Sequence, residues 1–271
     1  MLTRTDIRRD LTALGIQPGD SVMVHAAISK VGPVLGGPDT VIAALRDAVG
    51  PKGTLLGYAD WGVDFDALLD DEGRVPDAWR DHIPVFDPAA SRAARDNGVF
   101  PEFLRTTPGA LRSGNPGASV VALGAKAKHF TAEHPLNYGY GAGTPLARLV
   151  EEGGKVLMLG APLDAMTLLH HAEHIAPVSG KRLRRYEAPL RNGDGVRWSM
   201  IEEFDTGEPV LDGLPAEYFG DIVEQYLDTG KGRRSKVGAA DCVLVSAPEI
   251  TEFGVAWLQR YASAQASAPD T

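Results

Sequence analysis

The sequence has a single cysteine, no long apolar run and no excess of positive charge. Cys242 is the only cysteine of 271 residues, so the chain cannot close an internal disulfide, and its apolar run DCVLV is typical of a buried structural thiol. No stretch approaches the roughly 20 consecutive apolar residues that span a bilayer, and the charged start MLTRTDIRRDL is unlike a signal peptide. We therefore expect a cytoplasmic protein that is neither exported nor inserted in a membrane.

The formal net charge is −9, which argues against nucleic acid as a partner. Proteins that bind nucleic acid draw their affinity from clustered lysine and arginine. An acidic protein is better suited to a cationic ligand, although many proteins are this acidic for solubility alone.

The sequence also lacks an internal repeat, a clear linker, a P-loop and the glycine pattern of dinucleotide-binding folds. Hydrophobic residues make up 44% of the chain, enough for a substantial core. We expect one domain over residues 1–262, followed by a polar tail of small residues, 263–271, that is disordered.

Predicted strands and helices alternate along most of the chain. Hydrophobic periodicity predicts strands at 21–26, 54–59, 119–123, 155–160, 184–191, 196–204 and 236–245, and helices at 3–14, 38–50, 100–105, 144–152, 165–176, 216–228 and 248–261. This order favours an α/β fold with a mixed central sheet and flanking helices, its extra antiparallel strands coming from the second half. Between the second and third predicted strands lies a long irregular stretch, 60–96, and loops of that length are usually functional or disordered.

Two turns could hold a phosphate group. The loop from His25 to Gly32 leads a strand into a helix, and free backbone N–H groups at such a place can bind phosphate. Arg112 and Ser113 precede another strand and could do the same. An ordinary strand–helix connection and a plain surface turn fit these two patterns as well.

The long irregular stretch is rich in carboxylates. Between residues 60 and 81 the basic residues are only Arg74 and Arg80, against eight acidic ones: Asp60, Asp64, Asp66, Asp70, Asp71, Glu72, Asp77 and Asp81. A flap of this kind could capture a polycation through several charge-assisted hydrogen bonds, and a solvated loop is the alternative.

One predicted helix carries His170, Glu173 and His174 on a single face, since residues three and four apart are neighbours. Glu173 could orient His170 as a general base. The motif H-x-x-E-H also matches that of inverted zinc proteases, in which both histidines bind zinc. In this sequence Glu202, Glu203 or Asp205 could supply a third ligand. A helix with partly exposed histidines is the third interpretation.

Taken in order, several segments resemble the aminoglycoside 3-N-acetyltransferase family, from about residue 3 to residue 261. They are GDSVMVHAAISKVGPVLGG, GTLLGYADW, VFDPAAS, LRSGNPGASVVALG, GAGTPLARL, KVLMLGAPLDAMTLLHHAEHIA, KVGAADCVLV and ITEFGVAWL. The resemblance implies a fold distinct from the GNAT acetyltransferases, with the long irregular stretch as a substrate loop.

The resemblance also implies roles for particular residues. In the family motif T-x-x-H-x-x-E, Thr167, His170 and Glu173 match, which makes His170 the base and Glu173 its partner. Acetyl-CoA would be bound by His25, Ala26, Ala27, Ser29, Lys30, Val31 and Gly32, with Arg112 and Ser113 near its phosphates. The aminoglycoside would meet Tyr58, Asp60, Glu203 and Asp205.

The sequence departs from the family pattern at two places. Asn115 stands where R-S-x-H-P has a histidine, and Ala27 where many relatives have serine, which puts the cofactor contacts of these two side chains in question. His171 and His174 lie outside the family motif.

We expect acetyl-CoA to transfer its acetyl group directly to the 3-amino group of the deoxystreptamine ring, with no metal and no acetyl-enzyme. The alternatives are an acetyltransferase for another amine, a zinc hydrolase, and a cofactor-binding protein without catalysis.

Overall fold

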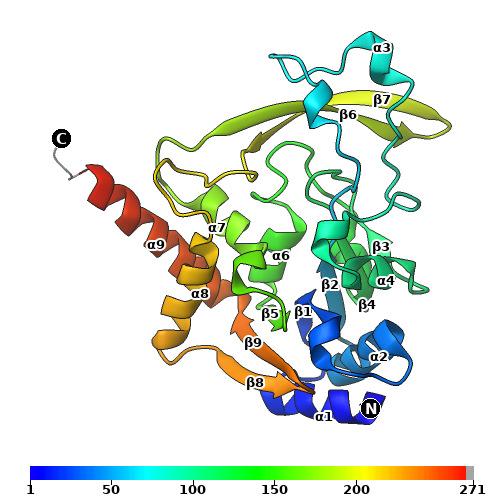
Figure 1. Ribbon diagram of the computed structural model, residues 1–271, viewed down its shortest axis with the longest axis vertical. Helices are drawn as coiled ribbons and strands as arrows, with labels where there is room; N and C mark the ends of the chain where they lie inside the picture. Colours follow the sequence, from blue (N-terminus) through cyan, green and yellow to red (C-terminus); the bar gives the residue numbers. More distant parts are fainter. Residues whose placement is uncertain (267–271) are drawn as a thin grey trace.

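The computed structural model describes residues 1–266, in which seven strands form a mixed sheet (Figure 1). Their order is β3-β4-β2-β1-β5-β9-β8. The central strands β2 (Thr54–Tyr58), β1 (Ser21–Ala26) and β5 (Lys155–Leu159) are parallel. The outer strands β3 (Leu111–Arg112), β4 (Val120–Gly124), β9 (Ala240–Ser246) and β8 (Arg233–Val237) pair in antiparallel fashion. The predicted α/β fold with a mixed sheet is confirmed.

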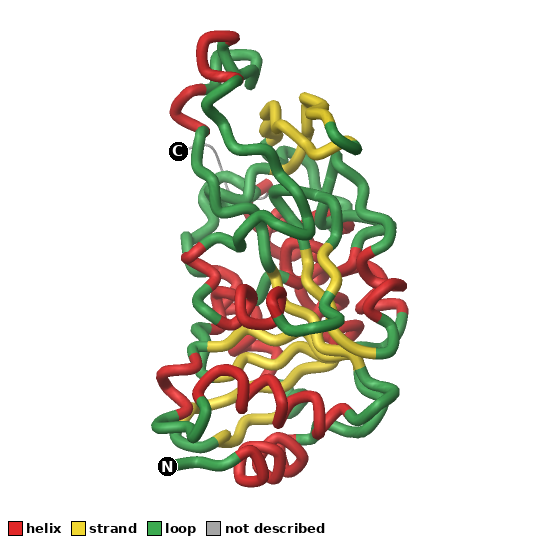
Figure 2. Tube along the Cα trace, turned by 90° about the vertical axis from the view of Figure 1, so that its right-hand side faces the viewer, coloured by secondary structure: helices red, strands yellow, loops and turns green. Residues whose placement is uncertain are grey.

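Helices cover both faces of this sheet, as the side view of Figure 2 shows. One face packs against α1 (Arg4–Leu14), α2 (Gly37–Val49) and α4 (Phe100–Thr106). The other packs against α5 (Ala127–Thr131), α6 (Pro145–Glu151), α7 (Leu168–Ile175), α8 (Tyr218–Asp228) and α9 (Ala247–Ala266). None of the helices within residues 1–266 has the length and apolarity needed to cross a membrane.

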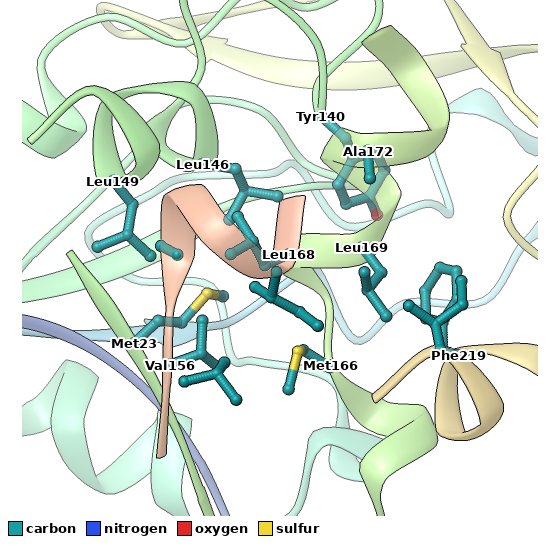
Figure 3. Close-up of a cluster of buried hydrophobic side chains, with 14 of the residues drawn as sticks. Met23, Tyr140, Leu146, Leu149, Val156, Met166, Leu168, Leu169, Ala172 and Phe219 are labelled. Carbon is teal, nitrogen blue, oxygen red and sulfur yellow. The ribbon is translucent and has the colours of Figure 1, made fainter. Parts of the chain in front are cut away.

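The two cores follow from the alternation of side chains along the strands. In β1, Met23 joins the core under α7, whereas Val22 and Val24 join the opposite core. Leu168 and Leu169 at the start of α7 lie in the same cluster as Met23 (Figure 3). This packing fixes the helix that carries the histidines over the carboxyl end of the sheet.

Local capping signals agree with the helix boundaries. Thr3 forms a capping box with Asp6 at the start of α1, and Gly15 ends that helix at φ +121°. Thr144 accepts a hydrogen bond from the N–H of Ala147, with Pro145 in the first turn of α6.

A second, two-stranded sheet lies above the central one and consists of β6 (Leu183–Asn192) and β7 (Gly195–Phe204) (Figure 1). It packs against residues 61–93, which include the short helix α3 (Asp77–Arg80). Their shared core consists of Phe65, Val75, Ile83, Phe86, Ala188, Leu190 and Ile201. We call residues 61–93 and 183–204 the roof. The predicted irregular stretch is thus folded onto a hairpin and is not merely a solvated loop.

Three predictions about the second half need correction. The second half does supply the antiparallel strands β9 and β8, but the strands at 184–191 and 196–204 form the roof hairpin outside the central sheet, and β3 and β4 from the first half supply its other antiparallel strands. The single strand predicted at 236–245 is the hairpin β8–β9, which turns at Gly238 with φ +59°. Helix α9 continues to Ala266, so the first four residues of the expected tail are helical, and the other five lie outside the described residues.

Candidate active site

Three adjoining cavities lie over the carboxyl ends of the parallel strands. The central cavity has a volume of about 320 Å³ and lies where β1 and β5 end and α7 begins. From β1 the chain runs to β2 on one side, and β5 returns on the other, so this is the topological switch point at which α/β sheets bind ligands. Its lining includes His25, Ala26, Ala27, Tyr58, Thr167 and His170.

His170 and Glu173 form a hydrogen-bonded pair at the wall of the central cavity. Nδ1 of His170 lies 2.6 Å from Oε2 of Glu173, and the two side chains are 22% and 3% exposed. A carboxylate only accepts, so Nδ1 carries the proton and the lone pair stays on Nε2. Nε2 makes no hydrogen bond to the described part of the chain. The ring is therefore ready to accept a proton from a group in the cavity.

Two aromatic rings fix the plane of the imidazole. Phe219 of α8 contacts His170 edge-on with ring centres 4.8 Å apart, and Tyr140 lies on another side at 5.0 Å. The hydroxyl of Tyr140 lies 2.6 Å from that of Tyr58, and both reach the carbonyl of Gly117. Burial raises the pKa of both tyrosines, so they serve as neutral hydrogen-bonding walls.

The acidic cavity, of about 480 Å³, lies between the sheet and the roof. Tyr58 and Asp96 line both this cavity and the central one, so the two are contiguous. Five carboxylates line it, Asp60, Asp64, Asp66, Asp96 and Glu203, against two cations, Arg95 and Arg184. Arg184 pairs with Asp66 at 2.5 Å, which leaves four carboxylates against one cation, Arg95. The cavity therefore favours a cationic ligand.

Asp60 is the most perturbed carboxyl group of the acidic cavity. Burial raises its pKa to about 6, although Asn97 donates a hydrogen bond to it and Arg112 lies nearby. Near neutral pH the side chain is mostly ionised, and a cationic ligand would stabilise that form.

The outer cavity has a volume of about 710 Å³ and shares Ala161 and Pro162 with the central cavity. Its lining includes three basic side chains, Lys30, Arg234 and Lys236. Arg234 and Lys236 form exposed pairs with Glu224 and Asp241. Lys30 has no ion pair among the described residues and is the cation best placed for an anionic group. The buried thiol of Cys242 also lines this cavity, and burial raises its pKa.

His25 at the end of β1 has an unusual environment. Its Nε2 is buried and, within residues 1–266, has no hydrogen-bond partner. Burial lowers its pKa to about 4, so the ring is neutral at physiological pH. A buried polar atom without a partner, beside a cavity, fits a ligand that supplies the missing bond.

His170 and His174, the two histidines of the H-x-x-E-H motif, form hydrogen bonds with different partners. His170 binds Glu173, whereas Nε2 of His174 lies 2.5 Å from Oε1 of Glu203. In the described part of the chain, no three His, Cys, Asp or Glu side chains are grouped so as to hold a metal ion. The geometry gives the zinc hydrolase interpretation no support.

Comparison with known proteins decides the family. A sequence model of the aminoglycoside 3-N-acetyltransferase family matches residues 23–259. The chain is 48% identical to aminoglycoside N(3)-acetyltransferase III of Pseudomonas aeruginosa, over 91% of this chain and 90% of that one. The chain belongs to the aminoglycoside 3-N-acetyltransferase family.

Solved structures of acetyltransferases agree. AAC-IIIb in a binary complex with CoASH matches with a TM-score of 0.95 and 63% identity, covering 96% of this chain and 97% of that one. AAC-VIa bound to sisomicin matches with a TM-score of 0.91 and 34% identity, covering 97% and 99%. The resemblance read from the sequence segments is confirmed.

Among the residues that the family resemblance pointed to, the structure brings many together. His170 and Tyr58 line the central cavity with His25, Ala26 and Ala27, and Glu173 lies directly behind His170. Asp60 and Glu203 line the acidic cavity, and Lys30 the outer one. The other members of the predicted cofactor loop line none of these cavities: Ser29 is exposed, Val31 is buried in a core, and Gly32 ends the turn with φ +97°.

Arg112 and Ser113 are engaged inside the protein. The guanidinium of Arg112 donates to Ser119 and to the carbonyls of Ser91 and Ala59, and it lies over the ring of Phe86. Ser113 is fully buried, where its hydroxyl meets the N–H of Val120 and the ring of His134. Neither lines any of the three cavities. These contacts are typical of residues that stabilise the fold. The predicted contact of Arg112 and Ser113 with the cofactor phosphates has no geometric support.

Asp205 and Asn115 also bond within the protein. Asp205 accepts the N–H of Gly207 in the turn after β7 and lines none of the three cavities, so its predicted substrate contact has no geometric support. Asn115, where the family pattern led us to expect a histidine, fastens its own loop through the N–H groups of Gly117 and Ala118.

Sequence reasoning missed two residues of the site and gave a third, His174, no part in the acetyl transfer. Tyr140 and Phe219 lie 30 and 49 residues from His170, respectively, and only the fold brings their rings to it. His174 lies outside the family motif, but its position four residues after His170 puts it on the same helical face.

Proposed function

We propose that this protein is an acetyl-CoA-dependent aminoglycoside 3-N-acetyltransferase in which His170 is the general base. The observation that carries the proposal is Nε2 of His170, which has no hydrogen-bond partner within residues 1–266 and belongs to a side chain that lines the central cavity, where the acidic and outer cavities meet it. The cationic aminoglycoside would occupy the acidic cavity, and acetyl-CoA would reach in from the outer one. Family membership supports both assignments.

In the transfer, an amine in its free-base form attacks the thioester carbonyl. The nitrogen–carbon bond forms, the carbon–sulfur bond breaks, and Nε2 of His170 takes the amine proton and passes it to the departing sulfur. Glu173 keeps the ring in the correct tautomer and offsets the charge of the imidazolium. At the end of the step His170 is back in its original protonation state, and the acetyl group has passed directly from sulfur to nitrogen. The transfer therefore needs neither a metal nor an acetylated residue.

The cofactor contacts follow from the turn after β1. Residues Ile28–Val31 form a 3-10 turn, and the first N–H groups of such a turn have no partner within it. These groups, with His25, would face the thioester end of acetyl-CoA, and Lys30 would meet its phosphates. We place the reaction in the cytoplasm, where its co-substrate is present.

Acetylation of an aminoglycoside removes one of the positive charges with which the drug binds its target, so the enzyme would confer resistance. The test measures release of CoA thiol from acetyl-CoA with gentamicin-like, neomycin-like and apramycin-like substrates, and locates the acetyl group by NMR. We expect modification at the 3-amino group and a loss of about 10²- to 10⁴-fold in the rate for His170→Ala, with acetyl-CoA binding retained. Acetylation only of unrelated amines, or near-normal turnover by His170→Ala, would refute the proposal.

A further inference from the structure

His174 is a buried histidine with a hydrogen-bond partner on each ring nitrogen. Its side chain is 2% exposed, Nδ1 lies 2.7 Å from the carbonyl oxygen of His170, and Nε2 lies 2.5 Å from Oε1 of Glu203. A carbonyl oxygen only accepts, so Nδ1 must carry a proton. The state of Nε2 is then decided by its partner, Glu203.

Glu203 has the hydrogen bonds of an ionised carboxylate. Its Oε2 accepts the N–H of Gly139 at 2.5 Å, and its Oε1 accepts the N–H of Phe204 at 2.9 Å. Backbone donors of this kind favour the charged form of a carboxyl group. With Glu203 ionised and Nδ1 protonated, Nε2 of His174 also carries a proton, and the two residues form a buried ion pair.

The pair connects the catalytic helix to the roof. His174 belongs to α7, four residues after the general base, whereas Glu203 is near the end of β7 and lines the acidic cavity. The ring of His174 is also packed edge-on against Phe204, with centres 4.8 Å apart. The carboxylate that faces the substrate is therefore tied to the same turn of helix that carries His170.

We propose that His174 is a positioning residue that keeps Glu203 ionised and fixed at the wall of the acidic cavity, where it binds an ammonium group of the aminoglycoside and so sets the distance of the acceptor amine from His170. This inference rests on the proposed function. It adds a residue that acts through Glu203, without touching the reacting atoms.

Loss of the positive charge should change the behaviour of Glu203 with pH. A carboxylate that stays buried without a cationic partner is costly, and it escapes the cost by taking a proton. A protonated Glu203 cannot form a charge-assisted hydrogen bond to an ammonium group. Raising the pH restores the carboxylate, so binding of the aminoglycoside should recover in alkaline solution.

Other titratable groups surround the pair on every side, and their contributions must be separated from it. They are His170, His171 and Glu173 on α7, Tyr138 and Tyr140 on the loop before α6, Lys181 before β6, Tyr186 on β6, and Asp60 in the wall of the acidic cavity. These groups are present in the wild type and in the His174 and Glu203 variants. The ratio of the variant's KM for the aminoglycoside to that of the wild type, taken at each pH, therefore isolates the change at Glu203.

The experiment compares His174→Gln, which keeps a hydrogen-bond donor and loses the charge, with the wild type between pH 6 and pH 9. At pH 6.5 we expect KM for the aminoglycoside to rise about tenfold to a hundredfold, the range that a charged hydrogen bond contributes. The ratio of variant to wild-type KM should fall as the pH rises, while KM for acetyl-CoA and kcat at saturation stay within about threefold.

A double-mutant cycle supplies the second readout. Glu203→Gln should raise KM at every pH without alkaline recovery, and His174→Gln with Glu203→Gln together should be no worse than Glu203→Gln alone. His171→Gln is the matched control, since His171 is similarly buried on the same helix but binds the carbonyl of Tyr140. A KM ratio for His174→Gln that is independent of pH, or additive effects in the double variant, would overturn the inference.

A spectroscopic measurement covers the case in which His174→Gln fails to fold. In the wild type at pH 7.5, both ring ¹⁵N signals of His174 should lie at imidazolium positions, and Glu203→Gln should convert them to those of a neutral ring protonated on Nδ1. A neutral His174 in the wild type would refute the ion pair. If the wild type acetylates no aminoglycoside, the proposed function fails instead, and the NMR result still decides the charge of His174.

Discussion

Nδ1 of His170 lies 2.6 Å from Oε2 of Glu173, a carboxylate that is almost completely buried. This contact engages Nδ1 in a hydrogen bond within the protein, so Nε2 is the ring nitrogen that can bind a group in the central cavity. Because an imidazole has only two nitrogens, the position of Glu173 alone determines which one can act as the base.

Replacing Glu173 by glutamine should therefore impair the chemical step more than substrate binding. The amide can turn its N–H group toward Nδ1, and the ring then carries its proton on Nε2 and cannot accept another. We expect Glu173→Gln to lower kcat about a hundredfold or more, with both KM values within about threefold. Steady-state kinetics with both substrates varied would measure this, and a kcat within twofold of the wild type would contradict the role of Glu173.

Asp60→Asn should weaken substrate binding and stabilise the protein. The folded protein raises the pKa of Asp60 from 3.8 to about 6, so the folded state holds its proton more tightly than the unfolded state. Wild-type stability therefore falls as the pH rises from 3.8 through 6, and the cost is complete above that window. An uncharged asparagine avoids a cost of roughly 2–3 kcal/mol.

Urea unfolding at two pH values tests the stability half of this prediction. The gain of Asp60→Asn in the free energy of unfolding should be present at pH 8 and absent near pH 4, where the wild-type carboxyl is largely protonated. Kinetics should show a higher KM for the aminoglycoside. Equal stability of the two proteins at pH 8 would mean that Asp60 is not strained by its burial.

The sequence allowed prediction of most strands of the central sheet and most helices that flank it, because their periodicity reflects burial directly. It predicted β1 and α7 well, and it could predict the pair His170 and Glu173 because helical spacing alone brings residues three apart together. The zinc interpretation could not be excluded at that level, since helical spacing does not say that His174 turns to Glu203 on a strand 29 residues away.

The packing of residues 61–93 against the β6–β7 hairpin, which forms the roof, could not be predicted for a different physical reason. Phe65, Val75 and Phe86 are spread along a segment without regular periodicity, and they become a core only when the β6–β7 hairpin folds over them. Likewise, Arg112 in a turn suggests a phosphate site until the three internal acceptors of its guanidinium are known. Such partners are far apart in the sequence and leave no local signal.

Ionic strength should affect binding of the aminoglycoside more than turnover. Five carboxylates line the acidic cavity, and salt screens their attraction for a polycation that approaches through solvent. Between 50 and 500 mM salt we expect KM for the aminoglycoside to rise several-fold while kcat changes by less than about twofold. Free 2-deoxystreptamine carries fewer charges and should show a smaller rise, so equal salt dependence for both substrates would speak against electrostatic capture.

Substitutions of Lys30 and Arg112 should separate cofactor binding from folding. Lys30 is exposed at the outer cavity without an ion pair among the described residues, so Lys30→Ala should leave Tm unchanged and raise the Kd of acetyl-CoA about fivefold to tenfold. Arg112 bonds with three internal acceptors in a fork that lysine cannot reproduce. Arg112→Lys should therefore lower Tm by several degrees and leave the Kd of the folded protein nearly unchanged.

Calorimetric titration with acetyl-CoA and with a pantetheine thioester that lacks the nucleotide distinguishes the two effects. If Lys30 contacts the phosphates, Lys30→Ala weakens the binding of acetyl-CoA but not that of the pantetheine thioester. Arg112→Lys should bind both ligands with the same Kd as the wild type. A selective loss of acetyl-CoA affinity in Arg112→Lys, without a change in Tm, would restore Arg112 as the phosphate contact. The burial of its guanidinium, which lowers the pKa of Arg112 to about 10, argues for the structural outcome, because the buried group already donates to three acceptors inside the protein.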